Sequence, residues 1–285
     1  MENLVEVSRL SKAFNDHTAI TDISFTLSCG QVLGLLGHNG AGKSTLINTL
    51  LGTLHYEGNV SLLGLAPEKH RAKVMEKVAY ISDVSALPSW MTIKQIINYM
   101  KGVHPQFDAD KAKSYLLDTE LKLRMKIAQL SKGMKVQLHL ALVMATDAQV
   151  LILDEPTLGL DLIYRERFYR DIKLWVQQNH RAMIIASHEV SEIEHLITDV
   201  LVLKSGEVVL QGSLDSLYAQ YTSIRIPHEN REKAEQYSPI YIKEDKGQAV
   251  MLFNDESSEA LFGLGQVFQT RLSDLFLAKQ LGLSA

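Results

Sequence analysis

The segment that most restricts the fold of this chain is a glycine-rich loop between two apolar stretches. It reads Gly37-His38-Asn39-Gly40-Ala41-Gly42-Lys43-Ser44-Thr45 and fits the pattern G-x-x-x-x-G-K-[ST]. A short apolar run, 31–36, precedes it, and apolar residues at helical spacing follow it over 44–51. A strand, a glycine loop and a helix in this order predict an α/β fold in which the loop wraps around an oligophosphate.

Each residue type in this loop has a chemical reason to be there. Glycines at 37, 40 and 42 let the backbone approach phosphate oxygens, so that successive N–H groups point at them. Lys43 is expected to place a mobile positive charge near the β and γ phosphates. The Ser44 hydroxyl suits Mg²⁺, which prefers oxygen ligands. The loop therefore predicts a bound nucleotide with Mg²⁺.

Two adjacent acids close a second apolar run, 151–153. Parallel α/β sheets place their ligand crevices at the carboxyl ends of the strands, where Asp154 and Glu155 stand. Asp154 is predicted to hold Mg²⁺ through its water shell. Glu155 is predicted to orient or deprotonate the attacking water, a role worth about 10² to 10⁴ in rate. His188 follows a third apolar run, and its imidazole is predicted to bond to a γ-phosphate.

The hydrophobic pattern divides the rest of the chain into regions. Alternation over 4–10 and 19–27 predicts an N-terminal antiparallel sheet. Residues 84–145 have the pattern of a helical insertion, and a stripe with Phe168, Ile172, Trp175 and Val176 predicts a helix between two parallel strands. These strands are expected at 150–153 and 183–186.

The pattern weakens after about Gly212. It predicts strands at 223–226, 240–243 and 249–253 and a closing helix over 272–281. We therefore expect a nucleotide-binding domain over 1–212 and a small α+β domain over 213–285.

Composition narrows the choice of partners and compartment. The net charge of −4 offers no general attraction for nucleic acid, which is not an expected partner. The single cysteine, Cys29, fits a reducing compartment and leaves no Cys/His ligand set for zinc. The first residues lack the features of a signal peptide, and no run of 18 apolar residues occurs. A role at a membrane would therefore need a separate partner.

Taken in order, these motifs resemble the ATP-binding domain of ABC proteins over about residues 3–212. Leu130-Ser131-Lys132-Gly133-Met134 stands where that family carries its LSGGQ signature. Ser131 and Gly133 keep the pattern, whereas Lys132 and Met134 depart from it. The resemblance implies a head-to-tail dimer in which Ser131, Gly133 and the helix N-terminus reach the γ-phosphate bound by the partner.

The resemblance implies further positions. Phe14 matches the aromatic residue that stacks on adenine, and Asp161 ends a loop, 158–161, that resembles the dimer contact. Asp83 falls where the family usually has a metal-contacting glutamine; its carboxylate is still a metal ligand but has no amide donor. Together, loop and resemblance assign nucleotide binding to Phe14, Gly37, Asn39, Gly40, Gly42, Lys43, Ser44, Thr45, Ser131, Gly133 and Asp161, metal binding to Ser44, Asp154 and Asp83, and catalysis to Glu155, His188 and Lys43.

The resemblance implies a P-loop NTPase fold of the ABC-ATPase type: a parallel-sheet core, an N-terminal antiparallel β layer, a helical subdomain at about 84–145 and a C-terminal α+β appendage. It also implies an ATP-hydrolysing subunit that dimerises on MgATP, as a homodimer or heterodimer, and powers a separate transmembrane permease. The subunit would lie in the cytoplasm against the inner face of the membrane. Residues 271–277 resemble the closing segment of ABC-2 type exporter subunits.

Two other functions remain open. A soluble ABC ATPase acting on ribosomes or chromosomes usually has two ATP domains or a long coiled-coil insertion, neither of which is found in these 285 residues. A regulatory module that switches without hydrolysis has less need of Asp154, Glu155 and His188 together. A GTPase is disfavoured because the sequence has no N-K-x-D motif.

Overall fold

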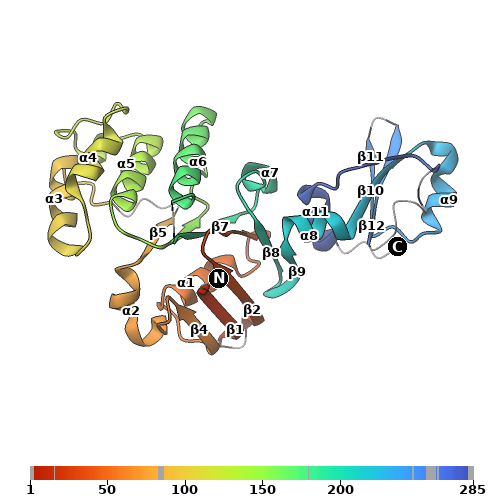
Figure 1. Cartoon of the computed structure of the whole chain (residues 1–285), viewed down its shortest axis with the longest axis horizontal. Helices are drawn as coiled ribbons and strands as arrows, with labels where there is room; N and C mark the ends of the chain where they lie inside the picture. Colours follow the sequence, from red (N-terminus) through yellow and green to blue (C-terminus); the bar gives the residue numbers. More distant parts are fainter. Residues whose placement is uncertain are drawn as a thin grey trace.

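The computed structural model describes residues 3–15, 17–82, 87–178, 180–245, 247–254, 261 and 263–281. Three β-sheets and their helices form an elongated molecule (Figure 1). The C-terminal sheet lies at one end and the helical region around α3 and α4 at the other.

A six-stranded sheet in the order β5-β6-β7-β3-β8-β9 forms the centre. Its strands are β3 (Val32–Leu36), β5 (Val78–Ser82), β6 (Val150–Asp154), β7 (Ala182–Ser187), β8 (Asp199–Lys204) and β9 (Glu207–Ser213). Neighbours from β5 through β8 pair in parallel, and β9 pairs antiparallel with β8. β3, β6 and β7 are buried almost throughout, as continuous apolar runs covered on both faces should be. The predicted parallel core is confirmed, with three further strands that the pattern did not single out.

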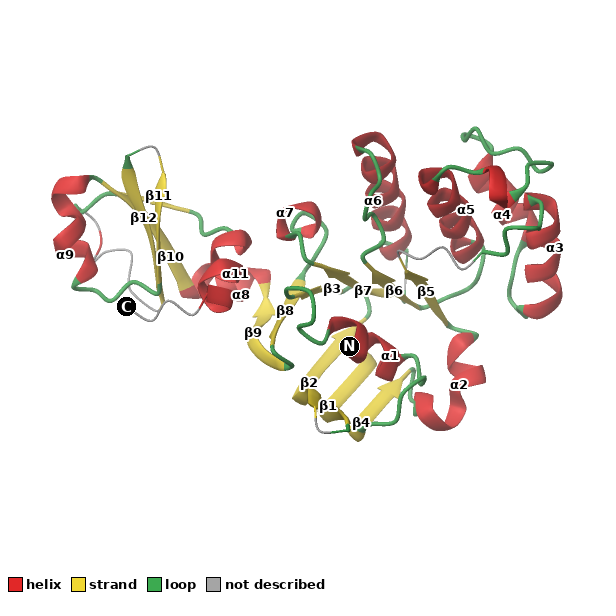
Figure 2. Ribbon diagram, turned by 180° about the vertical axis from the view of Figure 1, so that it is seen from behind, coloured by secondary structure: helices red, strands yellow, loops and turns green. Residues whose placement is uncertain are grey.

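The predicted N-terminal β layer is confirmed as a three-stranded antiparallel sheet in the order β2-β1-β4. Its strands are β1 (Asn3–Phe14), β2 (His17–Ser28) and β4 (Glu57–Leu62), of which β4 was not expected. Helix α1 (Lys43–Leu50) lies between this layer and the central sheet (Figure 2). One buried cluster contains Leu10 and Ile20 of the layer, Ile47 of α1 and Leu201 of the central sheet. Helix α2 (Pro67–Met75) follows β4.

The helical region carries its own small core. It contains α3 (Ile93–Val103), α4 (Ala109–Leu116), a 3-10 turn (Ile127–Gln129) and α5 (Lys132–Met144). The start of the predicted helical region near 84 lies outside the described residues. Helix α3 itself begins at Ile93, because the Thr92 side chain accepts from Gln95 N and so caps it. Ile96, Ile97 and Leu138 are buried here together.

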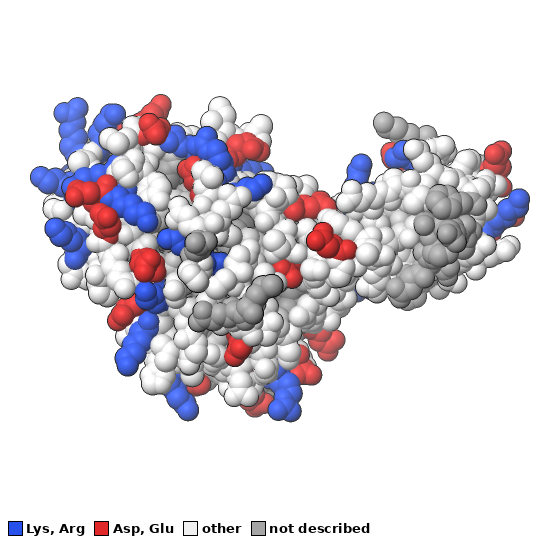
Figure 3. Space-filling model, in the orientation of Figure 1, with Lys and Arg blue, Asp and Glu red and all other residues white. Residues whose placement is uncertain are grey.

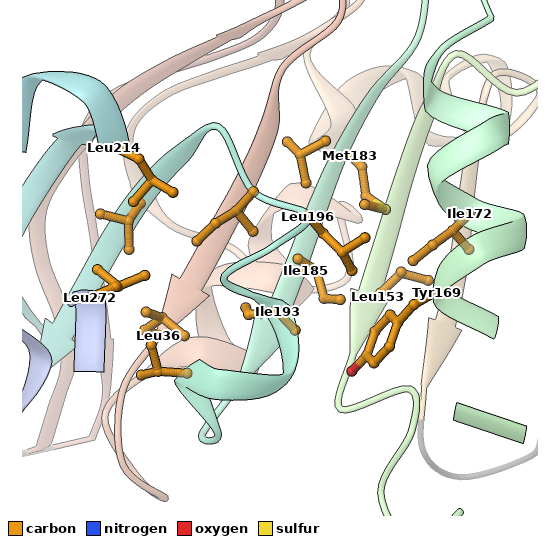
Figure 4. Packing of buried hydrophobic residues seen from close by; sticks show 14 of the residues in the cluster. Leu36, Leu153, Tyr169, Ile172, Met183, Ile185, Ile193, Leu196, Leu214 and Leu272 are labelled. Carbon is orange, nitrogen blue, oxygen red and sulfur yellow. The ribbon is translucent and has the colours of Figure 1, made fainter. Parts of the chain in front are cut away.

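The remaining helices of the larger lobe cover the other face of the central sheet (Figure 2). Helix α6 (Leu162–Val176) buries Phe168, Ile172 and Trp175, the stripe that the sequence predicts. Figure 4 shows Ile172 and Tyr169 of α6 beside Leu153 and Met183 of the sheet. Helix α7 (Val190–Ile193) follows β7.

The C-terminal residues build a second antiparallel sheet in the order β11-β12-β10-β13. Its elements are α8 (Leu214–Gln220), β10 (Tyr221–Ile226), a 3-10 turn (His228–Asn230), α9 (Arg231–Glu235), β11 (Tyr241–Asp245), β12 (Gln248–Asn254), β13 (Gln266–Phe268) and α11 (Leu272–Leu281). The three predicted strands and the closing helix are confirmed, and β13, α8 and α9 are additional.

The core of the larger lobe continues into this C-terminal part. One buried cluster joins Leu36 and Val202 of the central sheet to Leu214, Leu272 and Leu275. Figure 4 shows Leu36, Leu214 and Leu272 gathered from three separate elements. The domain boundary after Gly212 therefore stays a prediction, although β9 ends at Ser213 and the second sheet follows it.

Charged side chains of both signs are interspersed over the larger lobe on the face that Figure 3 shows. The C-terminal part presents fewer charges on that face. In the described part of the chain, no helix has the length and apolar character that crossing a membrane requires.

Candidate functional site

The glycine loop joins the end of β3 to the start of α1, as its sequence predicts. A side chain has no room at two of its glycines. A methyl group on Gly37 would lie 2.7 Å from the carbonyl oxygen of Leu203, and one on Gly42 would lie 2.8 Å from Cγ2 of Ile20. Gly42 also has φ of 108°, in the region that favours glycine. The loop is therefore held tightly between the two sheets.

The Lys43 side chain turns back over this loop. Its Nζ donates to the carbonyl oxygen of Gly37 at 2.7 Å and lies 3.7 Å from Oε1 of Glu155. Burial lowers the pKa of Lys43, while the negative charges of Glu155 and Asp154 act in the opposite direction. A buried ammonium between two carboxylates is suited to bind the terminal phosphates of a nucleotide.

Ser44 and Asp154 come together from elements far apart in the sequence. Ser44 Oγ donates to Asp154 Oδ2 at 3.2 Å, which places a hydroxyl and a carboxylate side by side. This pair of oxygen donors fits Mg²⁺. Asp83, the third predicted metal ligand, lies outside the described residues. Ser82, directly before it, pairs with Asp154 across β5 and β6.

Glu155 and His188 occupy equivalent places after β6 and β7. His188 Nδ1 lies 2.8 Å from Glu155 Oε2, and Glu155 N donates to Ala186 O at 3.1 Å. Glu155 has φ of 49°, an uncommon value for a residue other than glycine. This turn aims the carboxylate at Lys43 and His188 instead of along the strand. The arrangement can hold a water molecule beside a basic carboxylate.

An open cleft of about 340 Å³ lies over the loop. Nine of the residues that line it were predicted for the site: Phe14, Asn39, Gly40, Gly42, Lys43, Ser44, Thr45, Asp154 and Glu155. The cleft is also lined by His17, Ala19 and His38, for which no role was predicted. Phe14 ends β1 and is 43% exposed, and Lys12 Nζ lies 4.8 Å from its ring centre. An aromatic ring at one end and an ammonium at the other fit a base and its phosphates.

His17 was not predicted to line the site because the two strands expected from the alternating pattern cover 4–10 and 19–27 and leave it between them. β1 extends to Phe14 and β2 starts at His17, and these two residues pair directly across the turn. A lone histidine in a polar turn carries no spacing signal, so only the pairing places it in the cleft.

The comparisons with known proteins agree with this geometry. A family model described as ABC transporter matches residues 20–158. YhcH of Bacillus subtilis, an uncharacterized ABC transporter ATP-binding protein, is 30% identical over 73% of this chain and 70% of its own. The chain is an ABC transporter ATP-binding protein by family.

Two further similarities extend the match. The Nod factor export ATP-binding protein I of Sinorhizobium fredii is 31% identical over 73% of this chain and 62% of its own. The solved structure of CbiO1 from Clostridium perfringens, part of the ABC transporter complex CbiONQ, has a TM-score of 0.67 at 25% identity. It covers 77% of this chain and 92% of the CbiO1 chain. ABC transporter ATP-binding proteins are ATPases, so this chain is an ATP hydrolase whose family works with membrane components.

The residues predicted to contact a partner chain do not reach the cleft of this ABC protein itself. Ser131 caps α5, since its Oγ accepts from Met134 N at 3.2 Å. Gly133 lies against α6, where a methyl group would meet the Tyr164 ring at 2.9 Å. Asp161 caps α6 by accepting from Tyr164 N at 3.1 Å. None of Ser131, Gly133 and Asp161 lines the cleft over the glycine loop.

Lys132, one of the two departures from the signature, reaches the loop at 158–161. A methyl group on Gly159 would lie 3.3 Å from Lys132 Nζ. The Lys132 side chain therefore lies next to the predicted dimer loop of its own chain.

A polar network that sequence analysis missed lies behind the acidic pair of this ABC ATPase. Glu192 accepts from Thr157 Oγ1 and from the Tyr169 hydroxyl, each at 3.2 Å, and forms an ion pair with Arg165. Burial raises the pKa values of Glu192 and Tyr169. No sequence motif unites these four residues, because Thr157 lies in a loop, Arg165 and Tyr169 lie in α6, and Glu192 lies in α7.

Proposed function

We propose that this chain binds MgATP in the cleft over the glycine loop and hydrolyses it to drive a separate transmembrane permease. The observation that carries the proposal is the convergence of Lys43, Ser44, Asp154, Glu155 and His188 at one edge of the central sheet. In this proposal Ser44 and Asp154 hold Mg²⁺, which neutralises phosphate charge.

Each remaining side chain has a distinct part in the proposed reaction. Lys43 binds the β and γ phosphates while its carbonyl contacts fix its position. Glu155 orients the attacking water and accepts its proton. His188 holds the Glu155 carboxylate at Oε2 and bonds the γ-phosphate through its other ring nitrogen. Phe14 stacks on adenine.

Dimerisation is part of the same proposal. Ser131 and Gly133 lie outside the cleft of their own chain, which supports a second chain that provides these residues in trans. Two chains would then enclose two nucleotides, and hydrolysis would remove the γ-phosphate contacts that hold the pair closed. The dimer would be bound to its permease at the inner face of the membrane.

Export is the direction that we propose. The similarity to a Nod factor export protein supports it, together with the segment 271–277.

The test compares steady-state ATP hydrolysis by the wild-type chain and by Glu155→Gln, with size-exclusion chromatography of both in MgATP. Removing the carboxylate should lower kcat by about 10² to 10⁴ and leave an ATP-bound dimer. Glu232→Gln, an exposed position on α9, is the matched control and should match the wild type. Full turnover by Glu155→Gln would contradict the proposed role.

A wild-type chain that binds ATP without hydrolysing it would be tested again with a permease from the same transport system. Activity that appears only with the permease would support a partner-dependent transporter subunit. Inactivity in both conditions would favour the non-hydrolysing regulatory module.

A further inference from the structure

Helix α7 joins the hydrolysis pair to the C-terminal part of the chain. It begins two residues after His188 and is only four residues long. Glu192 lies within this helix, and Glu194 is the residue that caps its C-terminal end. These two carboxylates make contacts in different parts of the molecule.

Glu192 contacts the loop that follows the acidic pair. It accepts from Thr157, which lies two residues after Glu155, and from Tyr169 of α6, and Arg165 completes the group. Only 12% of the Glu192 side chain is exposed, so these bonds are shielded from water. This end of α7 is therefore tied to the loop that carries Glu155.

Glu194 faces the C-terminal part. Its Oε1 accepts from the Tyr218 hydroxyl of α8 at 2.8 Å and from Leu272 N, the first residue of α11, at 3.0 Å. Burial and the nearby Glu194 raise the pKa of Tyr218, which keeps its hydroxyl a donor. One carboxylate oxygen thus joins α7 to two C-terminal helices.

Apolar packing reinforces the same connection. Ile193 and Leu196 share a buried cluster with Leu214 of α8 and Leu272 of α11 (Figure 4). Closely packed side chains transmit displacements instead of absorbing them. A shift of α8 or α11 would therefore move α7 and the residues directly before it.

We propose that α7 transmits the position of the C-terminal helices to His188, and that Glu194 is a positioning residue for the His188–Glu155 pair. The role of the pair itself rests on the proposed function. Glu194 lies six residues after His188 and touches neither nucleotide nor Glu155, so its effect on hydrolysis passes through the backbone of α7.

The test uses the full chain with Glu194→Ala, Glu194→Gln and Tyr218→Phe. Glu244→Ala is the matched control, because Glu244 forms an exposed ion pair with Arg231 that makes no contact with α7. Two quantities are measured: steady-state kcat and KM for MgATP, and amide hydrogen exchange over residues 186–196, which needs no turnover.

Glu194→Ala should lower kcat about 3- to 10-fold, leave KM within about twofold and speed exchange over 186–196. Tyr218→Phe should do the same to a smaller extent. Glu194→Gln should restore both readouts, because its amide oxygen can still accept from Leu272 N. If the substitutions only damaged the fold, a smaller fraction of the protein would be active, and Glu194→Gln would not restore kcat and exchange.

Wild-type kcat and wild-type exchange in Glu194→Ala would overturn the inference. If Glu194→Ala does not fold, Tyr218→Phe decides, since it keeps the ring and removes one hydrogen bond. If Glu155→Gln retains turnover, the proposed function fails, and the exchange measurement alone decides whether Glu194 holds α7.

Discussion

Nδ1 of His188 lies 2.8 Å from Oε2 of Glu155, so the residues that follow two neighbouring strands share one hydrogen bond. The other carboxylate oxygen of Glu155 lies 3.7 Å from Lys43 Nζ. The carboxylate is thus approached from two sides, by the residue that follows β7 and by the first residue of α1.

His188→Ala should lower kcat by about 10²-fold, because it removes a preorganised hydrogen-bond donor from the reacting centre. ATP binding should change much less, since the proposed contact of His188 is to the γ-phosphate alone and every residue that lines the cleft over the loop is kept. Turnover assays and titration with a fluorescent ATP analogue measure the two effects separately. His55→Ala, at a side chain that is 91% exposed, is the control. A large loss of binding in His188→Ala would contradict this division of roles.

Gly133→Ala should destabilise the chain by about 1 to 3 kcal/mol, because the new methyl group meets the Tyr164 ring at 2.9 Å. Urea unfolding measures the change. Gly102→Ala in α3 is the control, since nothing lies within 4 Å of its added methyl group. It should stabilise the helix by up to about 1 kcal/mol. Equal effects of the two substitutions would show that α5 and α6 separate easily at this point.

Lys243→Met should destabilise the C-terminal sheet by about 3 to 5 kcal/mol, because it leaves the buried carboxylate of Asp274 without its cation. Only 2% of Asp274 is exposed. The double variant Lys243→Met/Asp274→Leu should recover most of the loss. Arg231→Met, which removes exposed ion pairs, should destabilise the chain much less than Lys243→Met does. Chemical unfolding decides, and a double variant no more stable than Lys243→Met would contradict the argument.

The stability of the chain should fall between about pH 6.5 and pH 4 because of His139 on α5. Burial lowers the pKa of His139 to about 4, so the unfolded chain binds a proton before the folded chain does. Protonation therefore favours unfolding as the pH decreases through this window, by about 1 to 3 kcal/mol in total. His139→Gln should flatten this part of the profile of unfolding free energy against pH. An unchanged profile would show that His139 is hydrated when folded.

Local sequence patterns predicted the strands in which nearly every side chain must be buried. The runs at 31–36, 150–153 and 183–186 are strands because only a sheet covered on both faces buries every side chain of an apolar run. β5 and β9 were missed for the opposite reason. Half-buried residues such as Tyr80 and Val209 interrupt the apolar pattern, and their burial depends on neighbours far away in sequence.

The amino-acid sequence alone was enough to predict the chemistry of the site, since Gly37 to Thr45, Asp154 and Glu155 stand in motifs whose spacing allows few other uses. It also determined that strand and helix meet at the loop. The contacts between distant side chains became visible in the folded chain alone: Ser44 with Asp154, Glu192 with Thr157, and Glu194 with Leu272. This difference arises because a local pattern reports which residues are buried, whereas contacts between distant residues depend on how sheets and helices pack together.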